Sequence, residues 1–146
     1  KWPLFEEDFT LVAHKDRALA RRNEVELKDL AGETIFSRPY CEQGERLAAI
    51  LEEADIDNWD AHRVVSEHDL LELLQANMGV AILPESFVAA NDLRAIRLRG
   101  VEMRRTVHAY SVSGRQRSPA GSLLLKLLRG ADWSAAGPGS MSRTAA

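Results

Sequence analysis

The segment from Ser66 to Ser86 constrains the fold more than any other part of the sequence. It opens with Ser66-Glu67-His68-Asp69, the serine-x-x-acid pattern that caps the start of a helix. A broad apolar helical face follows and ends at Gly79; it is formed by Leu70, Leu71, Leu73, Leu74 and Met78. Val80-Ala81-Ile82-Leu83 is then a continuous apolar run, closed by Pro84-Glu85-Ser86, and predicts a strand buried on both faces. A capped helix leading into such a strand favours an α/β protein.

The rest of the chain continues this alternation. Apolar and β-branched runs predict strands at residues 9–13, 34–36, 63–65, 93–98 and 106–112. Helices are expected at residues 17–22, 41–54 and 87–90, and a last one opens at Ser118-Pro119. One face of that last helix carries four leucines, which call for an apolar partner: Leu123, Leu124, Leu127 and Leu128. Residues 25–30 alternate before a turn at Ala31-Gly32, and residues 134–146 have the composition of a tail.

Length and composition exclude several classes of protein. The chain has 146 residues, with 45% hydrophobic and 28% charged residues, which fits one ordered domain and excludes disordered or collagen-like chains. No apolar run approaches the roughly 20 residues of a membrane span. A single cysteine fits a reducing compartment, so we expect a cytoplasmic protein. Because the chain begins with Lys1 rather than Met, we also expect it to be part of a longer polypeptide.

The charge of the chain argues against direct contact with nucleic acid. The formal net charge is −3 and the isoelectric point is near 5.8, whereas DNA-binding domains carry a basic surface. If the protein acts on DNA, another segment must touch it.

Three predicted strands end in polar residues. The segments are Ser37-Arg38-Pro39-Tyr40, Ser66-Glu67-His68 and Pro84-Glu85-Ser86. Ligands of open α/β sheets bind in the crevice beyond the carboxyl ends of the strands, so these segments could meet around one small molecule. Arg38 could hold a carboxylate through two parallel hydrogen bonds, helped by free amides of the helix beginning near Cys41. Two alternatives stay open: Arg38 pairs with a surface acid, and Ser66 only caps its helix.

We therefore predict a small anionic ligand at this edge. The expected contacts are Ser37, Arg38, Tyr40 and Ser66, with Pro84 and Glu85 shaping the rim.

Catalytic and metal chemistry find no support in the residues. The four histidines are scattered without the paired spacing of metal ligands, and phosphate-loop, dinucleotide and nucleophile-elbow motifs are absent from the sequence. Cys41 stands at a predicted helix start, which favours a thiolate, but Glu42 opposes this and no second cysteine is present. We expect an inert thiol, no metal, no cofactor and no enzymatic activity.

The run from Leu70 to Glu85 resembles the helix–glycine–strand–proline segment of LysR-type transcriptional regulators. The order of the surrounding segments also resembles that of the family. The family has a strand resembling residues 4–14, a short helix resembling residues 17–22, a Val-x-Leu-x-Asp-Leu motif resembling residues 25–30, and strand–helix pairs resembling residues 35–54 and 105–128. The resemblance covers residues 4–130. One departure is Asn77-Met78-Gly79, where the family often has Ala-Gly-x-Gly.

The resemblance implies a fold like that of type II periplasmic binding proteins, an α/β subdomain with a central mixed sheet. Residues 1–13 would be a first crossover strand and residues 14–105 the effector-binding subdomain II. Residues 106–130 would be the return crossover strand and the C-terminal helix of subdomain I, and residues 131–146 a flexible tail. Cys41 resembles in position the reactive thiol of the family's peroxide sensors, but Ile50 stands where the second thiol falls.

The function implied is that of an effector-sensing regulatory domain. It would bind a small molecule in a cleft between subdomains and act on DNA through a helix-turn-helix domain outside this chain. The family's side-by-side association, together with the leucine face of the last helix, predicts a homodimer or higher homo-oligomer. Two alternatives remain: a solute-binding module of a transport system, and a one-cysteine thiol redox protein that uses Cys41.

Overall fold

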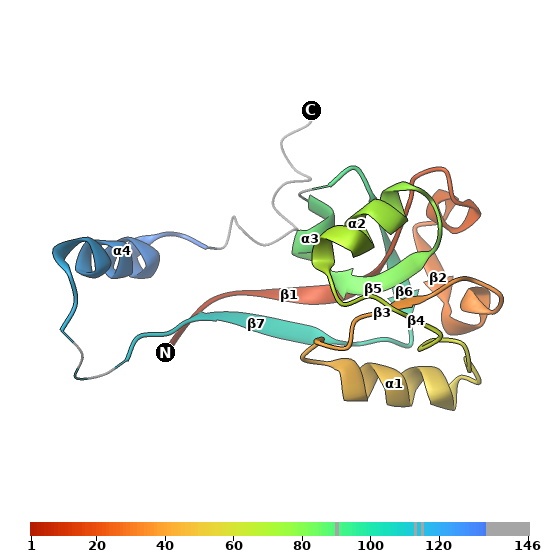
Figure 1. The fold of residues 1–146 in the computed structure, drawn as a ribbon, viewed down its shortest axis with the longest axis horizontal. Helices are drawn as coiled ribbons and strands as arrows, with labels where there is room; N and C mark the ends of the chain where they lie inside the picture. Colours follow the sequence, from red (N-terminus) through yellow and green to blue (C-terminus); the bar gives the residue numbers. More distant parts are fainter. Residues whose placement is uncertain (90, 113, 115, 134–146) are drawn as a thin grey trace. The chain divides into compact units, whose positions relative to one another are not determined.

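The computed structural model of the chain describes residues 1–89, 91–112, 114 and 116–133. The predicted tail therefore lies outside the described residues from 134 onward. In chain order (Figure 1) the elements are β1 (Trp2–Ala13), the 3-10 helix η1 (Ala18–Arg21), β2 (Glu24–Glu26), the 3-10 helix η2 (Leu27–Leu30), β3 (Phe36–Ser37), α1 (Gly44–Glu53), β4 (His62–Arg63), α2 (Glu67–Gln75), β5 (Val80–Pro84), α3 (Glu85–Ala89), β6 (Arg94–Arg99), β7 (Arg104–Ala109) and α4 (Pro119–Gly130).

The chain divides into two compact units. One comprises residues 8–103, and the other comprises residues 1–7 with those from 104 onward. β1 contributes to both units, because the division falls within it. The assignment of these parts to crossover strands and subdomains of a larger fold stays a prediction.

A mixed sheet organises the unit of residues 8–103. Its strands follow the order β2-β6-β1-β5. β1 runs antiparallel to both neighbours, with Leu11 opposite Ile82 of β5 and Ile96 of β6. β2 is parallel to β6 and is the last strand on that side. Its outward acids meet arginines of β6: Glu24 pairs with Arg97 and Arg99, and Glu26 pairs with Arg99.

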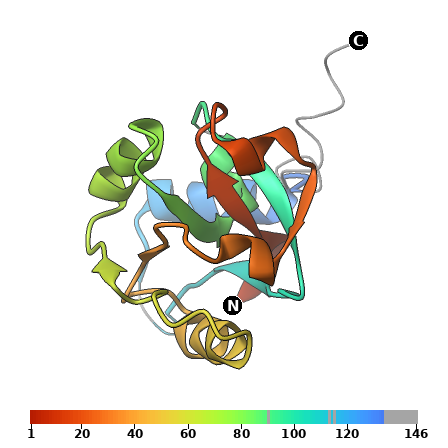
Figure 2. The same ribbon diagram turned by 90° about the vertical axis from the view of Figure 1, so that its right-hand side faces the viewer.

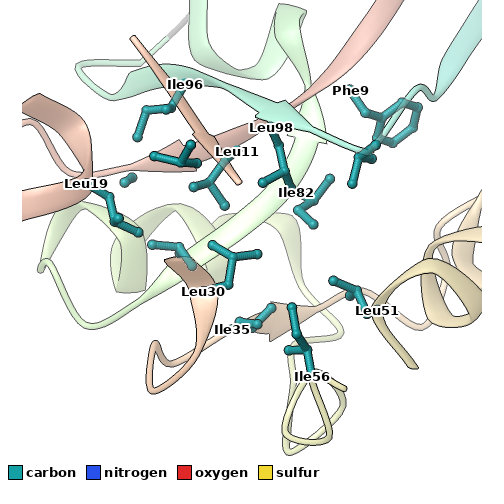
Figure 3. Packing of buried hydrophobic residues seen from close by; sticks show 14 of the residues in the cluster. Phe9, Leu11, Leu19, Leu30, Ile35, Leu51, Ile56, Ile82, Ile96 and Leu98 are labelled. Carbon is teal, nitrogen blue, oxygen red and sulfur yellow. The ribbon is translucent and has the colours of Figure 1, made fainter. Parts of the chain in front are cut away.

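Alternate residues of the central strands supply a core on each face of the sheet. On one face Leu11 and Ile82 pack in a cluster that includes Leu51 of α1 (Figure 3). On the other face Val12 and Leu83 join a cluster with α2, through Leu70 and Leu74. Figures 1 and 2 show α1 and α2 on opposite sides of the strands. Every residue of β5 is buried, as predicted for a strand covered on both faces.

β3 and β4 extend the parallel arrangement beside β5. β3 pairs in parallel with β4, Ser37 facing Arg63. An isolated parallel bridge joins Ile35 to Val80, and the Val80 amide donates to the Thr34 carbonyl at 2.9 Å. Three neighbouring strands thus run in the same direction, and their carboxyl ends share one edge.

The α2–β5 connection confirms the predicted cap but corrects the role of its glycine. Ser66 accepts a hydrogen bond from the Asp69 amide, as a helix cap does. The helix ends at Gln75, and the left-handed residue is Asn77 (φ 56°) rather than Gly79. Gly79 is required by space, because a Cβ there would lie 2.5 Å from the Thr34 carbonyl oxygen.

The second unit contains the start of β1, β7 and α4. Glu7 of β1 is buried and pairs with Arg105 of β7, the Arg105 Nη2 lying 2.7 Å from Glu7 Oε1. The Phe5 ring stacks on Trp133, beyond the end of α4. β7 ends at Ala109, three residues before the predicted end, and Tyr110 and Val112 are exposed.

The leucine face of α4 has no buried residue. The predicted helix start at Ser118-Pro119 is confirmed, and the Ser118 hydroxyl caps the helix by accepting from the Gly121 amide. Leu123, Leu124 and Leu127 are each more than half exposed. The predicted association of copies through this face stays a prediction. Among the described residues no helix is long and apolar enough to cross a membrane.

Candidate functional site

Ser37 ends β3 and is fixed on both sides. Its hydroxyl donates to Asp60 Oδ1 at 2.9 Å, and its carbonyl accepts from the Val64 amide at 2.9 Å. Asp60 also pairs with Arg63 at 3.5 Å. Sequence reasoning missed this aspartate, which lies between α1 and β4. The pair holds the end of β3 against the chain that enters β4.

Arg38 follows directly and is half-buried. Its Nη2 donates to Cys41 Sγ at 3.6 Å, and its guanidinium lies 5.6 Å from the centre of the Tyr40 ring. Within residues 1–89, 91–112, 114 and 116–133, no ion pair joins Arg38 to an acid. For this part of the chain, the alternative in which Arg38 pairs with a surface acid is therefore wrong. Arg38 thus presents an arginine cation with donors directed to a thiol and a ring face.

The predicted helix start at Cys41 is wrong by three residues. The Cys41 amide donates to the Arg38 carbonyl and the Gly44 amide donates to the Cys41 carbonyl, so residues 38–43 form turns before α1 begins at Gly44. The Cys41 amide is therefore already used within the turn. Any anion contact by this segment depends chiefly on Arg38 and less on the start of the helix.

Tyr40 and the first turn of α2 lie close enough to interact electrostatically. Partial burial raises the pKa of the Tyr40 hydroxyl, and the Glu67 carboxylate raises it further, while the Arg38 cation lowers it. The Tyr40 ring is nearly half exposed. The structure therefore brings the end of β3 and the start of α2 together. The Ser66 hydroxyl lies at this junction and is engaged by the Asp69 amide.

Pro84 and Glu85 stand at the end of β5, the third strand of the parallel set. Pro84 is buried opposite Phe9 of β1, and Glu85 is the first residue of α3. The topology places both residues at the edge of the sheet where β3 also ends, at Ser37. Their part in shaping a rim stays a prediction.

A hollow lies beside Arg38, and its volume is about 390 Å³ when the space at its open mouth is included. Its wall is mostly apolar and comes from five segments of the chain: Ile35, Phe36, Ser37, Arg38, Cys41, Gly44, Leu47, Leu51, Trp59 and Ile82. Sequence reasoning named only Ser37 and Arg38 among these as ligand contacts. The sequence held one local signal, the large aromatic residue Trp59, but this residue does not identify the rest of the wall.

Within the described residues, no three His, Cys, Asp or Glu side chains are grouped so as to hold a metal ion. Cys41 is a free, half-buried thiol.

These features define the class of protein: an α/β unit with the type II periplasmic-binding-protein-like fold, with polar strand ends along one edge. The predicted fold class is confirmed. The family model of the LysR substrate binding domain matches residues 1–133, and the chain belongs to this family. The family match favours a regulatory domain over the solute-binding and thiol redox alternatives. Among curated proteins no sequence matches.

Three solved structures illustrate the similarity. The regulatory domain of CcmR from Synechocystis PCC6803 in complex with 2-PG has a TM-score of 0.68 at 15% identity, covering 87% of this chain and 64% of that one. The effector binding domain of QuiR in complex with shikimate has a TM-score of 0.64 at 17% identity, covering 86% and 61%. CbnR, a LysR family transcriptional regulator, has a TM-score of 0.59 at 18% identity, covering 88% and 46%. The chain spans less than two thirds of the length of each.

Proposed function

We propose that this chain is the effector-sensing part of a cytoplasmic LysR-type transcriptional regulator. It binds a small anion at the shared carboxyl edge of β3, β4 and β5. The binding is relayed to a DNA-binding domain outside this chain. Ser37, Arg38, Tyr40 and Ser66 contact the effector, and Pro84 and Glu85 shape the rim.

The observation that carries this proposal is the state of Arg38. Arg38 is half-buried at a strand end beside a hollow, and it has no carboxylate partner in the described part of the chain. An arginine in this state is suited to bind an anion from solution. The acids Glu67 and Asp69 at the start of α2 oppose an anion there, so Arg38 sets the position of the charge.

The solved relatives support a small molecule as the effector. The structures of CcmR and QuiR hold 2-PG and shikimate, and both proteins share this fold. DNA contact by this chain itself is not part of the proposal, because its net charge is −3.

Thermal unfolding of the chain with a panel of small anions at constant ionic strength tests the proposal. A ligand present at tenfold excess over its Kd stabilises the folded state by roughly 1.4 kcal/mol. This corresponds to a rise of about 3 to 6 °C in Tm for a domain of this size.

Two charge-matched variants make the test specific. Arg38→Gln should abolish the rise in Tm. Arg94 is an exposed arginine of β6 that donates a hydrogen bond to Asn23, and Arg94→Gln should keep the rise in Tm. If no anion raises Tm, or if the rise survives in Arg38→Gln, the proposal is wrong.

A further inference from the structure

We infer that the effector is a small carboxylic acid with a short apolar tail, and that this tail fills the hollow beside Arg38. The inference rests on the proposed function and names the chemical class of its ligand. It excludes polyhydroxylated acids as the preferred ligands of this chain.

The wall of the hollow offers little to a polar group. Its lining includes the buried Leu51 and Ile82 and the partly buried Leu47 and Trp59. The Ser37 hydroxyl at the edge already donates to Asp60, and the Cys41 sulfur already accepts from Arg38. A hydroxyl placed inside would lose its hydrogen bonds to water and find few new ones.

The size of the hollow limits the tail. The room open to the centres of water-sized groups is about 30 Å³. Roughly 10–15 Å³ by this measure holds one water molecule, so the hollow takes a chain of about two or three heavy atoms. Water itself is a poor occupant, because it needs two to four polar partners.

Charge and apolar wall lie within reach of one small molecule. Arg38 is part of the wall, so a carboxylate on its guanidinium places the next carbon atoms at the mouth of the hollow. Two parallel hydrogen bonds would fix the direction of the carboxylate, and the tail would then follow the wall formed by Leu47. Each buried methylene adds about fourfold in affinity.

Nuclear magnetic resonance titration of the chain, which measures weak binding, tests this class. The ligands are the unbranched acids from acetate to hexanoate, and 3-hydroxypropionate as the hydroxylated match of butyrate. Affinity should rise about fourfold per methylene up to a tail of about three carbons and then level off. Butyrate should bind at least about fivefold more tightly than 3-hydroxypropionate.

Two variants of α1 locate the tail. Leu47 and Ile50 are both partly buried against the same core, but only Leu47 lines the hollow. In Leu47→Ala the rise in affinity should continue to hexanoate, whereas Ile50→Ala, a matched loss of apolar side chain, should keep the wild-type dependence on length.

The outcomes separate this inference from the proposed function. The inference is overturned, and the anion site stands, if the acids bind through Arg38 but their affinity does not depend on tail length. The same conclusion follows if 3-hydroxypropionate binds with the affinity of butyrate. An unchanged length dependence in Leu47→Ala also overturns it. If no acid shifts resonances near Arg38, both fail.

Discussion

Replacing Gly79 by alanine tests the packing that joins β3 to β5. The added Cβ would lie 2.5 Å from the Thr34 carbonyl oxygen and 2.6 Å from Phe36 Cε2, whereas ordinary contacts begin near 3.4 Å. The carbonyl would have to withdraw by about 0.9 Å to restore contact distance. That shift would break the bond of 2.9 Å that it accepts from the Val80 amide.

The expected cost combines two effects. Overpacking a well-filled core costs about 1–3 kcal/mol, and a lost backbone hydrogen bond costs about 0.5–1.5 kcal/mol. We therefore expect the Gly79→Ala substitution to lower the free energy of unfolding by about 2–4 kcal/mol. Because β3 leads directly into Arg38, anion binding should weaken as well.

Urea unfolding followed by tryptophan fluorescence and circular dichroism measures the change. Gly44→Ala is the matched control, since a Cβ at this first residue of α1 meets nothing closer than Cys41 Cβ at 3.9 Å. It should stabilise the chain by roughly 0.4–1 kcal/mol, because alanine restricts the unfolded chain more than glycine does. If Gly79→Ala unfolds within about 0.5 kcal/mol of the wild type, the close approach of β3 and β5 is not as described.

Three further substitutions test other contacts. Ser66→Ala should lower stability by about 1 kcal/mol in urea unfolding through loss of the α2 cap, and an unchanged midpoint would show that the cap contributes nothing. Glu7→Gln should cost about 1.5–3 kcal/mol because it leaves Arg105 without its buried carboxylate, and a loss below about 0.5 kcal/mol would contradict the pair. In Tyr110→Phe, which leaves Tyr40 as the single tyrosine, ultraviolet titration should give a midpoint above pH 10.0, the ordinary value. Since the unfolded chain loses that proton first, stability should fall as the pH rises from 10 toward the folded pKa. A midpoint at or below 10 would refute the effect of partial burial on the Tyr40 hydroxyl.

The parts of the fold that were predictable have strong local signals. The apolar run of β5 and the serine cap of α2 each depend on residues within one short segment, so the sequence pattern was enough. The start of α1 was not predictable, because the turns that delay it to Gly44 depend on backbone hydrogen bonds around Arg38 and Cys41.

The candidate site was predictable only in part. The rule that parallel strands share a carboxyl edge anticipated the common edge of the segments at Ser37, Ser66 and Pro84, and the topology agrees. The hollow could not be predicted, because its wall joins residues as distant as Ile35 and Ile82. The need for Gly79 likewise arises from a strand more than 40 residues earlier in the chain.

The edge strand β2 has a consequence for the protein in concentrated solution. An open strand edge is a template on which another chain can add a strand, and proteins guard against this with short strands and charged side chains. β2 is three residues long, and its Glu24 and Glu26 are bound to Arg97 and Arg99 of β6. An incoming strand would have to accommodate both acids and both arginines. This side of the sheet is therefore a poor template for the addition of a strand from another copy of the domain.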